Sequence, residues 1–510
     1  MARLVSEGVD LDRMARFLDD LNTGKFRDSR GIEPASVPDL SNSSIIDRRR
    51  PASWTMSAND ARERFAELDL PFAPESVAAN VVTADSGKQY VFDEIALEKI
   101  GVHLYPKAAW GVLNGGSAST YADVKKNRAL DPALFEQYRA RFETLSDRCR
   151  GKPKGITPAY INPDGTPGYS FLLLKLRMLL EHKKRYFELT GTLPDVILPA
   201  FQMTSVQTDR AIGDAFREYT MLEELRGIAD SIGCSSIDIF TETQTMMAAI
   251  THSSEGLPRR VFDRAYGKPD TGIAIPGGPG PNFEILAPIY RKMYKQGIRY
   301  VWLGNIDNMG YTVDPVSLAI FALSGKEAAF EASFRTPMDV KGGIIVTDHS
   351  GKFTCADIGP NIGFEDVLEF EKAGKAILFN CAIGLFDLGR LIERLDELPY
   401  RLPLRITDQD KDAGRYAQAE QITWEIIGLL DDPLFFAVEK TRRFLAAKML
   451  METILTSMPP ADGTSAAAFG AAREAGAGHV AADLHRGLES LFRREYGLVL
   501  EYGRWEIPAR

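Results

Sequence analysis

Short apolar segments alternate with longer amphipathic segments from about Ile95 onward. Five short apolar runs are typical of β-strands, namely Ala109–Val112, Asp195–Ala200, Ile237–Phe240, Tyr300–Leu303 and Gly343–Thr347. Between them, apolar residues recur at helical spacing, which predicts helices over Ser170–Leu189, Asp209–Ser231 and Glu284–Gln296. This alternation predicts an α/β fold with a mostly parallel sheet, in which ligands bind at the carboxyl ends of the strands.

The first 94 residues have a different pattern and are predicted to form an accessory region. Apolar residues at helical spacing predict a helix over Val9–Leu21. A second helix is expected over Ser57–Leu68, with Ser57 as its N-terminal cap. The segment between them, residues 28–53, is rich in Ser, Pro and Asp, which indicates a loop that wraps the surface.

The pattern predicts a small, mostly helical region from about Leu404 to the C-terminus. The expected helices are Tyr416–Leu430, Leu434–Met458 and Val480–Glu495. Residues 459–478 are rich in Ala and Gly, so this segment is expected to be flexible or loosely helical. The chain is therefore predicted to divide into an accessory region (1–94), a core (95–403) and a helical region (404–510).

Composition narrows the class of protein without naming its function. The chain has 510 residues, of which 45% are hydrophobic, and its net charge is -9. This charge argues against nucleic-acid or anionic-membrane binding through bulk electrostatics. The four cysteines form no CxxC pair, and no apolar run approaches the roughly 20 residues of a membrane span. We therefore expect a soluble cytoplasmic protein without a disulfide scaffold.

A glycine-rich turn follows the first predicted core strand. It contains, in order, Leu113, Asn114, Gly115, Gly116, Ser117, Ala118, Ser119 and Thr120. Two adjacent glycines let the backbone turn sharply and approach a ligand, and the hydroxyls and N–H groups that follow suit a phosphate. The same residues also suit an ordinary turn between a strand and a helix.

Three further segments combine turn residues with charged or amide groups. Pro153 and Pro158 flank Lys154, so the lysine could be held at a fixed reach toward a phosphate. Residues 276–282 contain Gly277, Gly278 and Gly280 with three prolines, which indicates a rigid loop that can approach a ligand closely. Asn305 and Asp307 follow a predicted strand, where a carboxylate is well placed to hold Mg²⁺ against a phosphate.

Two later segments add basic residues. Lys341 precedes the predicted strand at Gly343, and Arg443 and Lys448 lie in a predicted C-terminal helix. The two helical residues are either solvated charges or phosphate clamps that reach over the site. Neither Gly151-Lys152 nor Gly351-Lys352 continues as a Walker A motif, and the chain lacks GxSxG, HExxH and GxGxxG patterns.

Taken in order, these segments resemble the eukaryote-type UDP-sugar pyrophosphorylases. That family includes UTP–glucose-1-phosphate uridylyltransferase and UDP-N-acetylhexosamine pyrophosphorylase. The matching segments are Leu113–Gly116 (LNGG), Lys154-Gly155, Met203–Ser205 with Thr208, Pro276–Gly278, Gly304–Gly310 (NxDNLG-like), Asp339–Gly343 (DVKGG), Phe379-Asn380 and Arg443–Lys448.

The resemblance implies a GT-A-like, Rossmann-related mixed sheet flanked by helices, with residues 95–403 as a nucleotidyltransferase core. It also implies a Mg²⁺-dependent reaction in which UTP and a sugar 1-phosphate give a UDP-sugar and pyrophosphate. Each matching position then has an implied role: Lys154 and Lys448 catalytic; Leu113, Asn114, Gly115, Gly116, Gln244, Gly277 and Asn305 nucleotide-binding; Gly278, Lys341 and Asn380 substrate-binding; Asp307 metal-binding.

Several alternatives stay open at the level of sequence. Either Glu242 or Gln244 can read the base, and Lys125 and Lys126 are rivals of Lys154 as the phosphate lysine. Glucose 1-phosphate is the first expectation for the sugar and an N-acetylhexosamine 1-phosphate the second. The alternative function is a catalytically weakened homologue that binds a nucleotide or a sugar nucleotide as a regulatory protein. The oligomeric state is left open.

Overall fold

The computed structural model describes residues 2–27, 33–84, 87–119, 121–130, 132–234, 237–336, 339, 341–458 and 477–508. The α-helices are α1 Ala2–Ser6, α2 Leu11–Thr23, α3 Ala58–Glu67, α4 Glu94–His103, α5 Val124–Leu130, α6 Pro132–Cys149, α7 Phe171–Thr190, α8 Asp209–Thr220, α9 Glu223–Ser231, α10 Asn282–Ile285, α11 Ala287–Lys295, α12 Pro315–Ser324, α13 Phe364–Lys372, α14 Leu388–Arg394, α15 Leu398–Arg401, α16 Lys440–Arg443, α17 Leu450–Ser457 and α19 Ala477–Arg494.

The strands fall into one large central sheet and several small ones. Their bounds are β1 Ile45–Asp47, β2 Trp54–Ser57, β3 Asn80–Ala84, β4 Gly87–Phe92, β5 Ala108–Leu113, β6 Ala200–Ser205, β7 Ile239–Gln244, β8 Met247–Ala248, β9 Ile250–Thr251, β10 Ala274–Ile275, β11 Tyr300–Asn305, β12 Ala328–Phe334, β13 Gly343–Thr347, β14 Phe353–Asp357, β15 Leu378–Asp387, β16 Leu404–Lys411, β17 Gly414–Gln421, β18 Leu434–Val438, β19 Val499–Glu501 and β20 Arg504–Glu506.

The central sheet is mixed. Its main path runs β1-β18-β12-β15-β11-β5-β6-β7, and β13 and β14 join it beside β15. Strands β11, β5, β6 and β7 are mutually parallel, whereas β15 runs antiparallel to both β11 and β12. The expected mixed sheet flanked by helices is confirmed.

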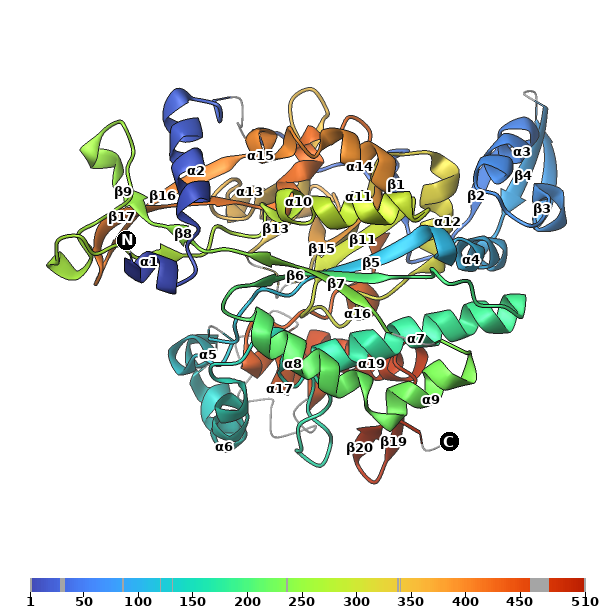
Figure 1. Cartoon of the computed structure of the whole chain (residues 1–510). Coiled ribbons are helices and arrows are strands. Elements are labelled where there is room, and N and C mark those ends of the chain that lie inside the picture. Colours follow the sequence, from blue (N-terminus) through green and yellow to red (C-terminus); the bar gives the residue numbers. More distant parts are fainter. Residues whose placement is uncertain are drawn as a thin grey trace.

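Helices cover both faces of this sheet (Figure 1). In β5, Ala108, Trp110 and Val112 pack on the side of α7, whereas Ala109 and Leu113 pack on the side of α11. Since side chains of a strand alternate between its two faces, both faces of β5 are buried. This explains why the strand is a continuous apolar run in the sequence.

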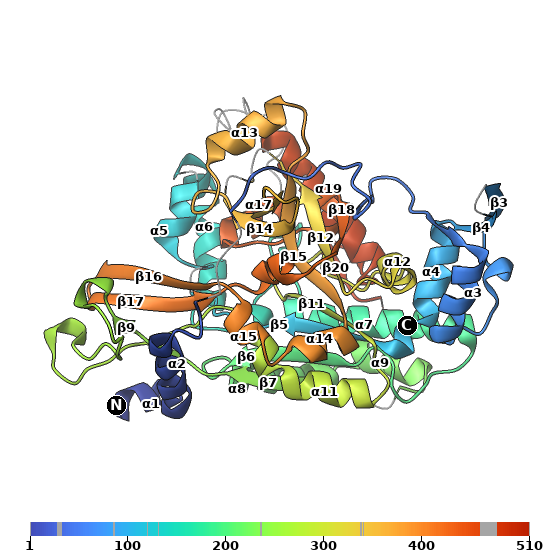
Figure 2. The same ribbon diagram turned by 90° about the horizontal axis from the view of Figure 1, so that it is seen from above.

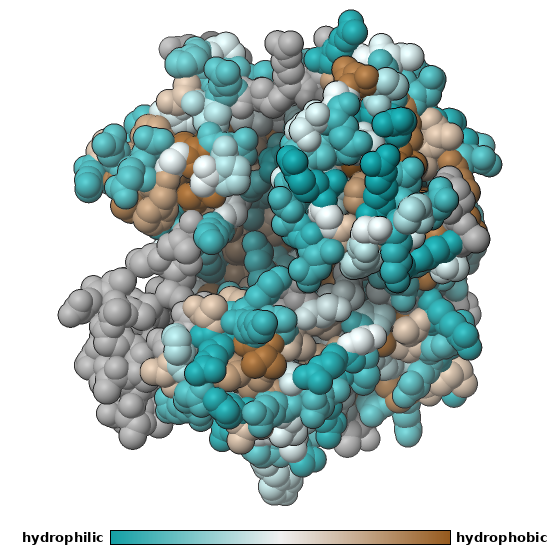
Figure 3. Space-filling model, turned by 90° about the vertical axis from the view of Figure 1, so that its left-hand side faces the viewer, coloured by the Kyte–Doolittle hydropathy of each residue, from teal (hydrophilic) through white to brown (hydrophobic). Residues whose placement is uncertain are grey.

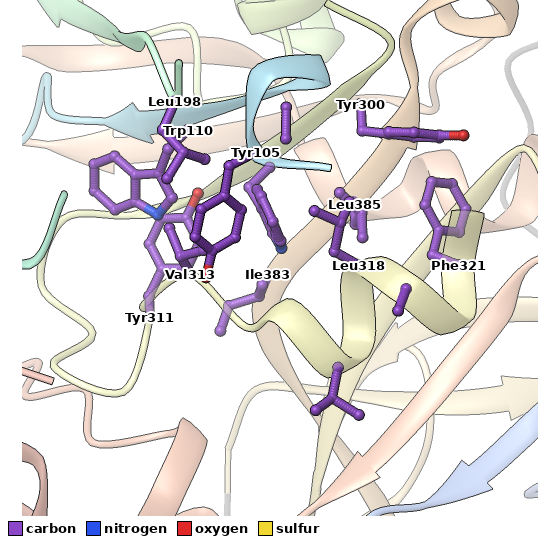
Figure 4. Packing of buried hydrophobic residues seen from close by; sticks show 14 of the residues in the cluster. Tyr105, Trp110, Leu198, Tyr300, Tyr311, Val313, Leu318, Phe321, Ile383 and Leu385 are labelled. Carbon is purple, nitrogen blue, oxygen red and sulfur yellow. The ribbon is translucent and has the colours of Figure 1, made fainter. Parts of the chain in front are cut away.

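Aromatic and aliphatic side chains pack together in the core beside the sheet (Figure 4). Trp110 of β5 and Tyr311, in the loop after β11, stack with ring centroids 4.7 Å apart and an interplanar angle of 20°. The hydroxyl of Tyr311 donates a hydrogen bond to the carbonyl oxygen of Gly111 at 2.6 Å. The loop that follows β11 is thereby packed against the neighbouring strand.

Two predicted strands begin later in the chain than expected. The prediction over Asp195–Ala200 is wrong except for its last residue, because β6 starts at Ala200. Pro199 cannot donate to a ladder and Leu198 has a φ of 40°, so the apolar run before Ala200 is buried without being a strand. Strand β7 begins at Ile239 and continues to Gln244; it lies at the end of the sheet, where polar residues are tolerated.

The C-terminal region contradicts the prediction of mostly helical structure over residues 404–458. In place of the helix Tyr416–Leu430, β16 and β17 form a hairpin followed by a 3-10 helix at Thr423–Leu429. In place of the first part of the helix Leu434–Met458, β18 joins the central sheet beside β12. A short run of buried apolar residues is ambiguous between helix and strand, and tertiary pairing decides. The final helix is confirmed as α19, and residues 459–476 lie outside the described part.

The N-terminal residues are more ordered than expected. Helices α2 and α3 are confirmed, and the hydroxyl of Ser57 accepts a hydrogen bond from the amide of Asp60, as a cap does. Within the predicted surface loop, however, β1 pairs with β18 and so extends the central sheet. Seen from above, the hairpin β16–β17 projects from the sheet beside α2 and β9 (Figure 2).

Candidate functional site

The segments singled out in the sequence meet at one edge of the central sheet. The parallel register places Leu113 of β5 opposite Asn305 of β11 and also opposite Met203 of β6. The loops that follow these three strands therefore leave the same carboxyl edge. This edge is where open α/β sheets bind their ligands.

The glycine-rich turn is held mainly by β6. The amide of Asn114 donates to the carbonyl oxygen of Met203 at 2.8 Å, and its side-chain Nδ2 donates to Gln202 Oε1 at 3.0 Å. The hydroxyl of Ser205 donates to the carbonyl oxygen of Gly115 at 3.0 Å. Leu113 and Asn114 are buried, whereas Gly116 is exposed with open space where a Cβ would lie. Thr120 lies outside the described residues.

Lys154 is brought to this turn by backbone pairing. Its amide donates to the carbonyl oxygen of Gly116 at 3.0 Å, and the amide of Ala118 donates to the carbonyl oxygen of Lys152 at 2.9 Å. The next residue, Gly155, packs so close to the Asn114 side chain that a Cβ would lie 2.2 Å from Asn114 Oδ1. A larger residue beside the lysine would therefore displace the Asn114 side chain.

The predicted phosphate lysine and the predicted metal carboxylate form an ion pair. Lys154 Nζ lies 2.6 Å from Asp307 Oδ2, and their side chains are 11% and 21% exposed. The same ammonium donates to the carbonyl oxygen of Ala447 and lies over the ring of Tyr121. By contrast, the rivals Lys125 and Lys126 are exposed on α5. The structure thus joins Lys154 and Asp307 at one point.

Asn308, next to Asp307, ties this loop to the C-terminal segment. Its Oδ1 accepts from the amides of Gly310 and Leu445, at 2.9 and 3.0 Å, and its Nδ2 donates to the carbonyl oxygen of Arg443 at 3.0 Å. Gly310 lies so close to Arg443 that a Cβ would be 2.4 Å from the Arg443 carbonyl carbon. Sequence reasoning missed the role of Asn308, although it lies within the Asp307 motif.

Arg443 does not reach over the site as a phosphate clamp. Its guanidinium forms a two-pronged ion pair with Glu331 of β12, with contacts of 2.6 and 2.7 Å. Burial disfavours both charges; it raises the pKa of Glu331, while the pKa of Arg443 is raised by the carboxylate beside it. The guanidinium of Arg443 is therefore engaged in a buried ion pair of the core and does not point toward a phosphate site.

Lys448 lies outside any helix, contrary to the prediction. Residues 444–449 form an irregular segment that runs along the Asp307 loop, because Asn308 pairs with Ala446 and Met309 with Leu445. Lys448 itself is exposed, and its amide donates to Glu452 Oε2 at 2.6 Å. Its neighbour Ala447 contacts the Lys154 ammonium, so Lys448 stands at the margin of the site.

The glycine- and proline-rich loop lies against β7 and β17. Gln244 Nε2 donates to the carbonyl oxygen of Gly278 at 2.8 Å. Gly278 has a φ of 76°, and a Cβ there would lie 2.7 Å from the carbonyl oxygen of Gln421, so only glycine fits. A Cβ at Gly277 would likewise crowd Met247. Glu242, two residues before Gln244 on β7, shares its face of the strand, and which of the two reads a base is not decided by these contacts.

Asn380 lies on β15, and Lys341 lies in the segment directly before β13. Ile344 of β13 pairs with Phe379 of β15, which places the segment before β13 beside Asn380. The side chain of Asn380 is buried; its Nδ2 donates to Cys355 Sγ at 3.5 Å and its Oδ1 accepts from the Ala382 amide at 3.0 Å. Burial raises the pKa of the Cys355 thiol to about 12, so it is a neutral partner.

The register of β15 places Asn380, and with it the segment that carries Lys341, at the same edge of the sheet as Asp307. Ile383 lies opposite Gly304 in the antiparallel pair, and Asn380 therefore extends beyond the carboxyl end of β11. Lys341 is exposed, and Val340 lies outside the described residues. The roles of both residues toward a sugar stay predictions.

A fully buried lysine was missed by sequence reasoning. Lys175, in the middle of α7, contacts the carbonyl oxygens of the loop that carries Asp307. The signal was present in the sequence, because a lysine stands among leucines on a helix that is apolar on all sides at this point.

The donor set suits Mg²⁺ only with a phosphate ligand. Among the described residues no group of three or more His, Cys, Asp or Glu side chains could hold a metal. Mg²⁺ is commonly bound by one or two carboxylates together with substrate phosphates. A single carboxylate, Asp307, beside a turn suited to phosphate fits that pattern.

The side of the molecule that carries these loops is hollowed between an upper and a lower part (Figure 3). In Figure 1 the upper part on that side contains α2 and the hairpin β16–β17, and the lower part contains α5 and α6. None of the helices in the described part of the chain is long and apolar enough to cross a membrane.

Comparisons with known proteins identify the family of the chain. Residues 170–458, more than half of the chain, match the protein family described as UTP–glucose-1-phosphate uridylyltransferase. A Schizosaccharomyces pombe protein described as "Probable UTP–glucose-1-phosphate uridylyltransferase" is 29% identical over 216 residues, which cover 42% of this chain and 37% of that protein. The UTP–glucose-1-phosphate uridylyltransferase of Solanum tuberosum is 26% identical over 234 residues, covering 45% and 46%. The chain thus aligns with less than half the length of these relatives.

A solved structure extends the likeness to nearly the whole chain. The uridine diphosphate N-acetylglucosamine pyrophosphorylase of Trypanosoma brucei superposes with a TM-score of 0.53 at 14% identity, covering 95% of this chain and 92% of that one. At this identity the match concerns the fold. The family match over residues 170–458, which is more than half of the chain, shows that the chain belongs to the UTP–glucose-1-phosphate uridylyltransferase family.

Proposed function

We propose that this protein is a nucleotidyltransferase that makes a UDP-sugar and pyrophosphate from UTP and a sugar 1-phosphate. The observation that carries the proposal is the ion pair between Lys154 and Asp307, at the carboxyl edge of β11 and beside the exposed glycine of the β5 turn. A lysine for phosphate charge and a carboxylate for a cation stand within reach of the same ligand. The family match supports the reaction class.

In the proposed reaction a phosphate oxygen of the sugar 1-phosphate attacks the α-phosphorus of UTP, and pyrophosphate leaves with the electron pair of the broken bond. The protein needs no covalent intermediate, so its contribution is positioning and neutralisation of charge. Backbone groups at Gly115 and Gly116 hold the triphosphate, with Lys154 and Lys448 neutralising its charge. Mg²⁺, held by Asp307, would supply further neutralisation of the phosphates.

For the sugar we propose glucose 1-phosphate first and an N-acetylhexosamine 1-phosphate second. The curated relatives support glucose by their names, whereas the Trypanosoma brucei structure supports N-acetylglucosamine. Neither Gly278 nor Ala382 has a polar side chain that could hydrogen-bond a sugar hydroxyl, so backbone groups and Asn380 carry the contacts in this proposal. The cytoplasm is the proposed compartment, since all four cysteines are free thiols.

Pyrophosphate release tests the proposal directly. The full chain is incubated with UTP, Mg²⁺ and either glucose 1-phosphate, N-acetylglucosamine 1-phosphate or no sugar, and pyrophosphate and the UDP-sugar are measured together. We expect equal amounts of both products with one of the sugars and neither product without sugar. The matched control is Asp307→Asn, which keeps the shape and an acceptor oxygen of the side chain.

The alternative function has its own outcome in the same experiment. If no sugar gives turnover but UTP or a UDP-sugar raises the melting temperature, the protein is a regulatory binder of nucleotides, and the proposed reaction is rejected. The engagement of Gln244 and Asn380 in internal hydrogen bonds is the feature that favours this alternative.

A further inference from the structure

The amino group of Lys175 makes all its short contacts with oxygens around one loop. Nζ lies 2.8 Å from the carbonyl oxygen of Asn308, 2.7 Å from that of Tyr311 and 2.9 Å from the hydroxyl of Tyr496. A fourth oxygen, the carbonyl of Met309, lies at 3.5 Å. The residue is fully buried in the middle of α7. Three short hydrogen bonds use the three N–H groups of an ammonium.

Packing alone does not explain a lysine at this position. Its neighbours Leu174 and Leu176 are fully buried, so a leucine or methionine here would continue the apolar surface of α7. Burying an amine is costly unless its hydrogen bonds are made. Burial lowers the pKa of Lys175, whereas the surrounding acceptor oxygens favour its charged form. A neutral amine donates two hydrogen bonds, so at least two of the three contacts hold in either state.

The loop on which Lys175 acts is the loop that carries Asp307. It leaves β11 at Asn305 and ends at Tyr311, whose ring is fixed against Trp110 (Figure 4). The amide of Met309 donates to Leu445, and the amide of Tyr311 to Asn308. These contacts hold the amides of the loop, whereas Lys175 holds its carbonyl oxygens from the side of α7.

Tyr496, which lies directly after α19, provides a further contact with the Asp307 loop. The hydroxyl of Tyr496 donates to the carbonyl oxygen of Met309 at 2.6 Å and accepts from Lys175. Arg177, two residues after Lys175 on α7, donates to the carbonyl oxygen of Tyr496 at 2.6 Å. Two residues of α7 and the segment after α19 are therefore joined to the Asp307 loop.

We propose that Lys175, together with Tyr496, is a positioning residue that holds the loop of residues 307–311 in the conformation in which Asp307 meets Lys154. Its consequence for catalysis rests on the proposed function. The hold itself is a property of the free protein and is measured without substrate.

Hydrogen exchange of the full chain tests the hold. In Lys175→Met, we expect the amides of residues 308–311 to exchange roughly 10-fold faster or more, because the variant loses hydrogen bonds that oppose local opening. The matched control is Lys183→Met. Lys183 is also buried on α7 but lies eight residues further along, about 12 Å from Lys175 along the helix axis. We expect no change in loop exchange in this control.

A milder variant covers the case in which Lys175→Met does not fold. Tyr496→Phe removes only the hydroxyl that links Lys175 and Met309, and it should accelerate exchange in the same four amides by a smaller factor. Unchanged exchange in Tyr496→Phe and in a folded Lys175→Met would overturn the proposal. So would equal acceleration in Lys183→Met, because the effect would then be general loosening of α7.

Kinetics separate positioning from the proposed reaction. If the wild type makes a UDP-sugar, Lys175→Met should lower kcat by more than about 10-fold with little change in KM for UTP, since the carboxylate is misplaced while the glycine turn is intact. Lys183→Met should keep the kcat of the wild type. If the wild type has no turnover but the exchange result holds, the proposed function fails and the positioning role stands.

Discussion

At the residue scale, the pairing of Lys154 with Asp307 sets the charge of the site before any ligand binds. The two groups neutralise each other at 2.6 Å, and both are largely buried. A triphosphate with its cation offers each partner a stronger opposite charge, so binding exchanges one ion pair for two new ones. Removing either residue leaves the other partly buried and unpaired, which is more costly than losing an exposed pair.

This pairing predicts different outcomes for two substitutions. Asp307→Asn keeps a hydrogen-bond acceptor for Lys154, so we expect an intact fold and a loss of turnover of about 10³-fold, the range for a lost electrostatic stabiliser. Lys154→Met should lower both turnover and the melting temperature, because the Asp307 carboxylate then loses its cation. Pyrophosphate release and thermal unfolding monitored by circular dichroism measure both effects. Full activity in Asp307→Asn would remove this residue from the metal site.

Lys448 differs from Lys154 because it is exposed and its side chain is not needed for the fold. Lys448→Ala should therefore leave the melting temperature unchanged and lower kcat by about 10²-fold or more, as expected for a lost phosphate cation. Arg442→Ala is the matched control, since Arg442 is also exposed and lies on α16, directly before the segment that carries Lys448. Wild-type kinetics in Lys448→Ala would show that the alignment of this segment with the family is wrong.

The sequence predicts each of these residues from its own motif but not their arrangement. Lys154 and Asp307 are 153 positions apart, so no local pattern reports their contact. The sequence leaves undecided whether Arg443 is a phosphate clamp, because its partner Glu331 lies on a strand whose burial the sequence does not reveal. The contacts of Lys175 with the Asp307 loop likewise depend on tertiary packing, which no local pattern in the sequence reports.

At the scale of elements, α12 depends on a partly buried capping residue, Asp314. Asp314 Oδ1 accepts from the amides of Val316 and Ser317, and Oδ2 accepts from the hydroxyl of Ser317. Burial alone would raise the pKa of this carboxyl, but the Arg48 and Arg443 charges and the Ser317 hydrogen bonds prevail and lower it to about 2. The carboxylate therefore stabilises the folded state whenever it is ionised.

The pKa of Asp314 gives a pH prediction with a definite sign. A carboxyl whose pKa falls from about 4 in the unfolded chain to about 2 in the fold contributes stability above pH 4, and this contribution is lost as the pH falls toward 2. It amounts to about 2 kcal/mol. Asp314→Asn should thus be less stable than wild type at pH 6, with the difference shrinking between pH 4 and pH 2. Urea unfolding across this range measures it; a constant difference would contradict the assigned pKa.

Strand prediction succeeds where the pattern has one explanation. The runs at Tyr300–Leu303 and Ala109–Val112 are buried on both faces of a parallel sheet, and their strands were predicted within a few residues. Strand prediction fails for β18, a buried apolar run, and for β17, a half-exposed alternating segment. Over a short stretch of sequence, both patterns are also compatible with a helix. Strand β18 pairs with β12, which is distant in the sequence. Strand β17 pairs with β16, the strand directly before it in a hairpin.

At the scale of the whole molecule, the N-terminal region is part of the architecture of the site. Leu4, Val9 and Met14 pack against Met246 and Ala417, and α2 thereby lies beside the loop of residues 276–282. A cavity of about 350 Å³ between α2 and this loop is lined by Arg13, Arg16, Gly277 and Gln421. The accessory role predicted from the sequence therefore includes a contact with the predicted nucleotide-binding loop.

Arg13 joins α2 to α10, directly after that loop, through an ion pair of 2.6 Å with Glu284. Glu284 is half-exposed, and such pairs contribute less than about 1 kcal/mol, so Arg13→Ala should leave the melting temperature nearly unchanged. We expect instead a KM several-fold higher for the sugar 1-phosphate or UTP, because the 276–282 loop loses one of its supports. Arg16 lines the same cavity, so Arg16→Ala is the control. We expect the KM values of this variant to equal those of the wild type. Equal KM values in all three proteins would mean that α2 braces the fold without influencing the loop, and that the N-terminal helices serve stability alone.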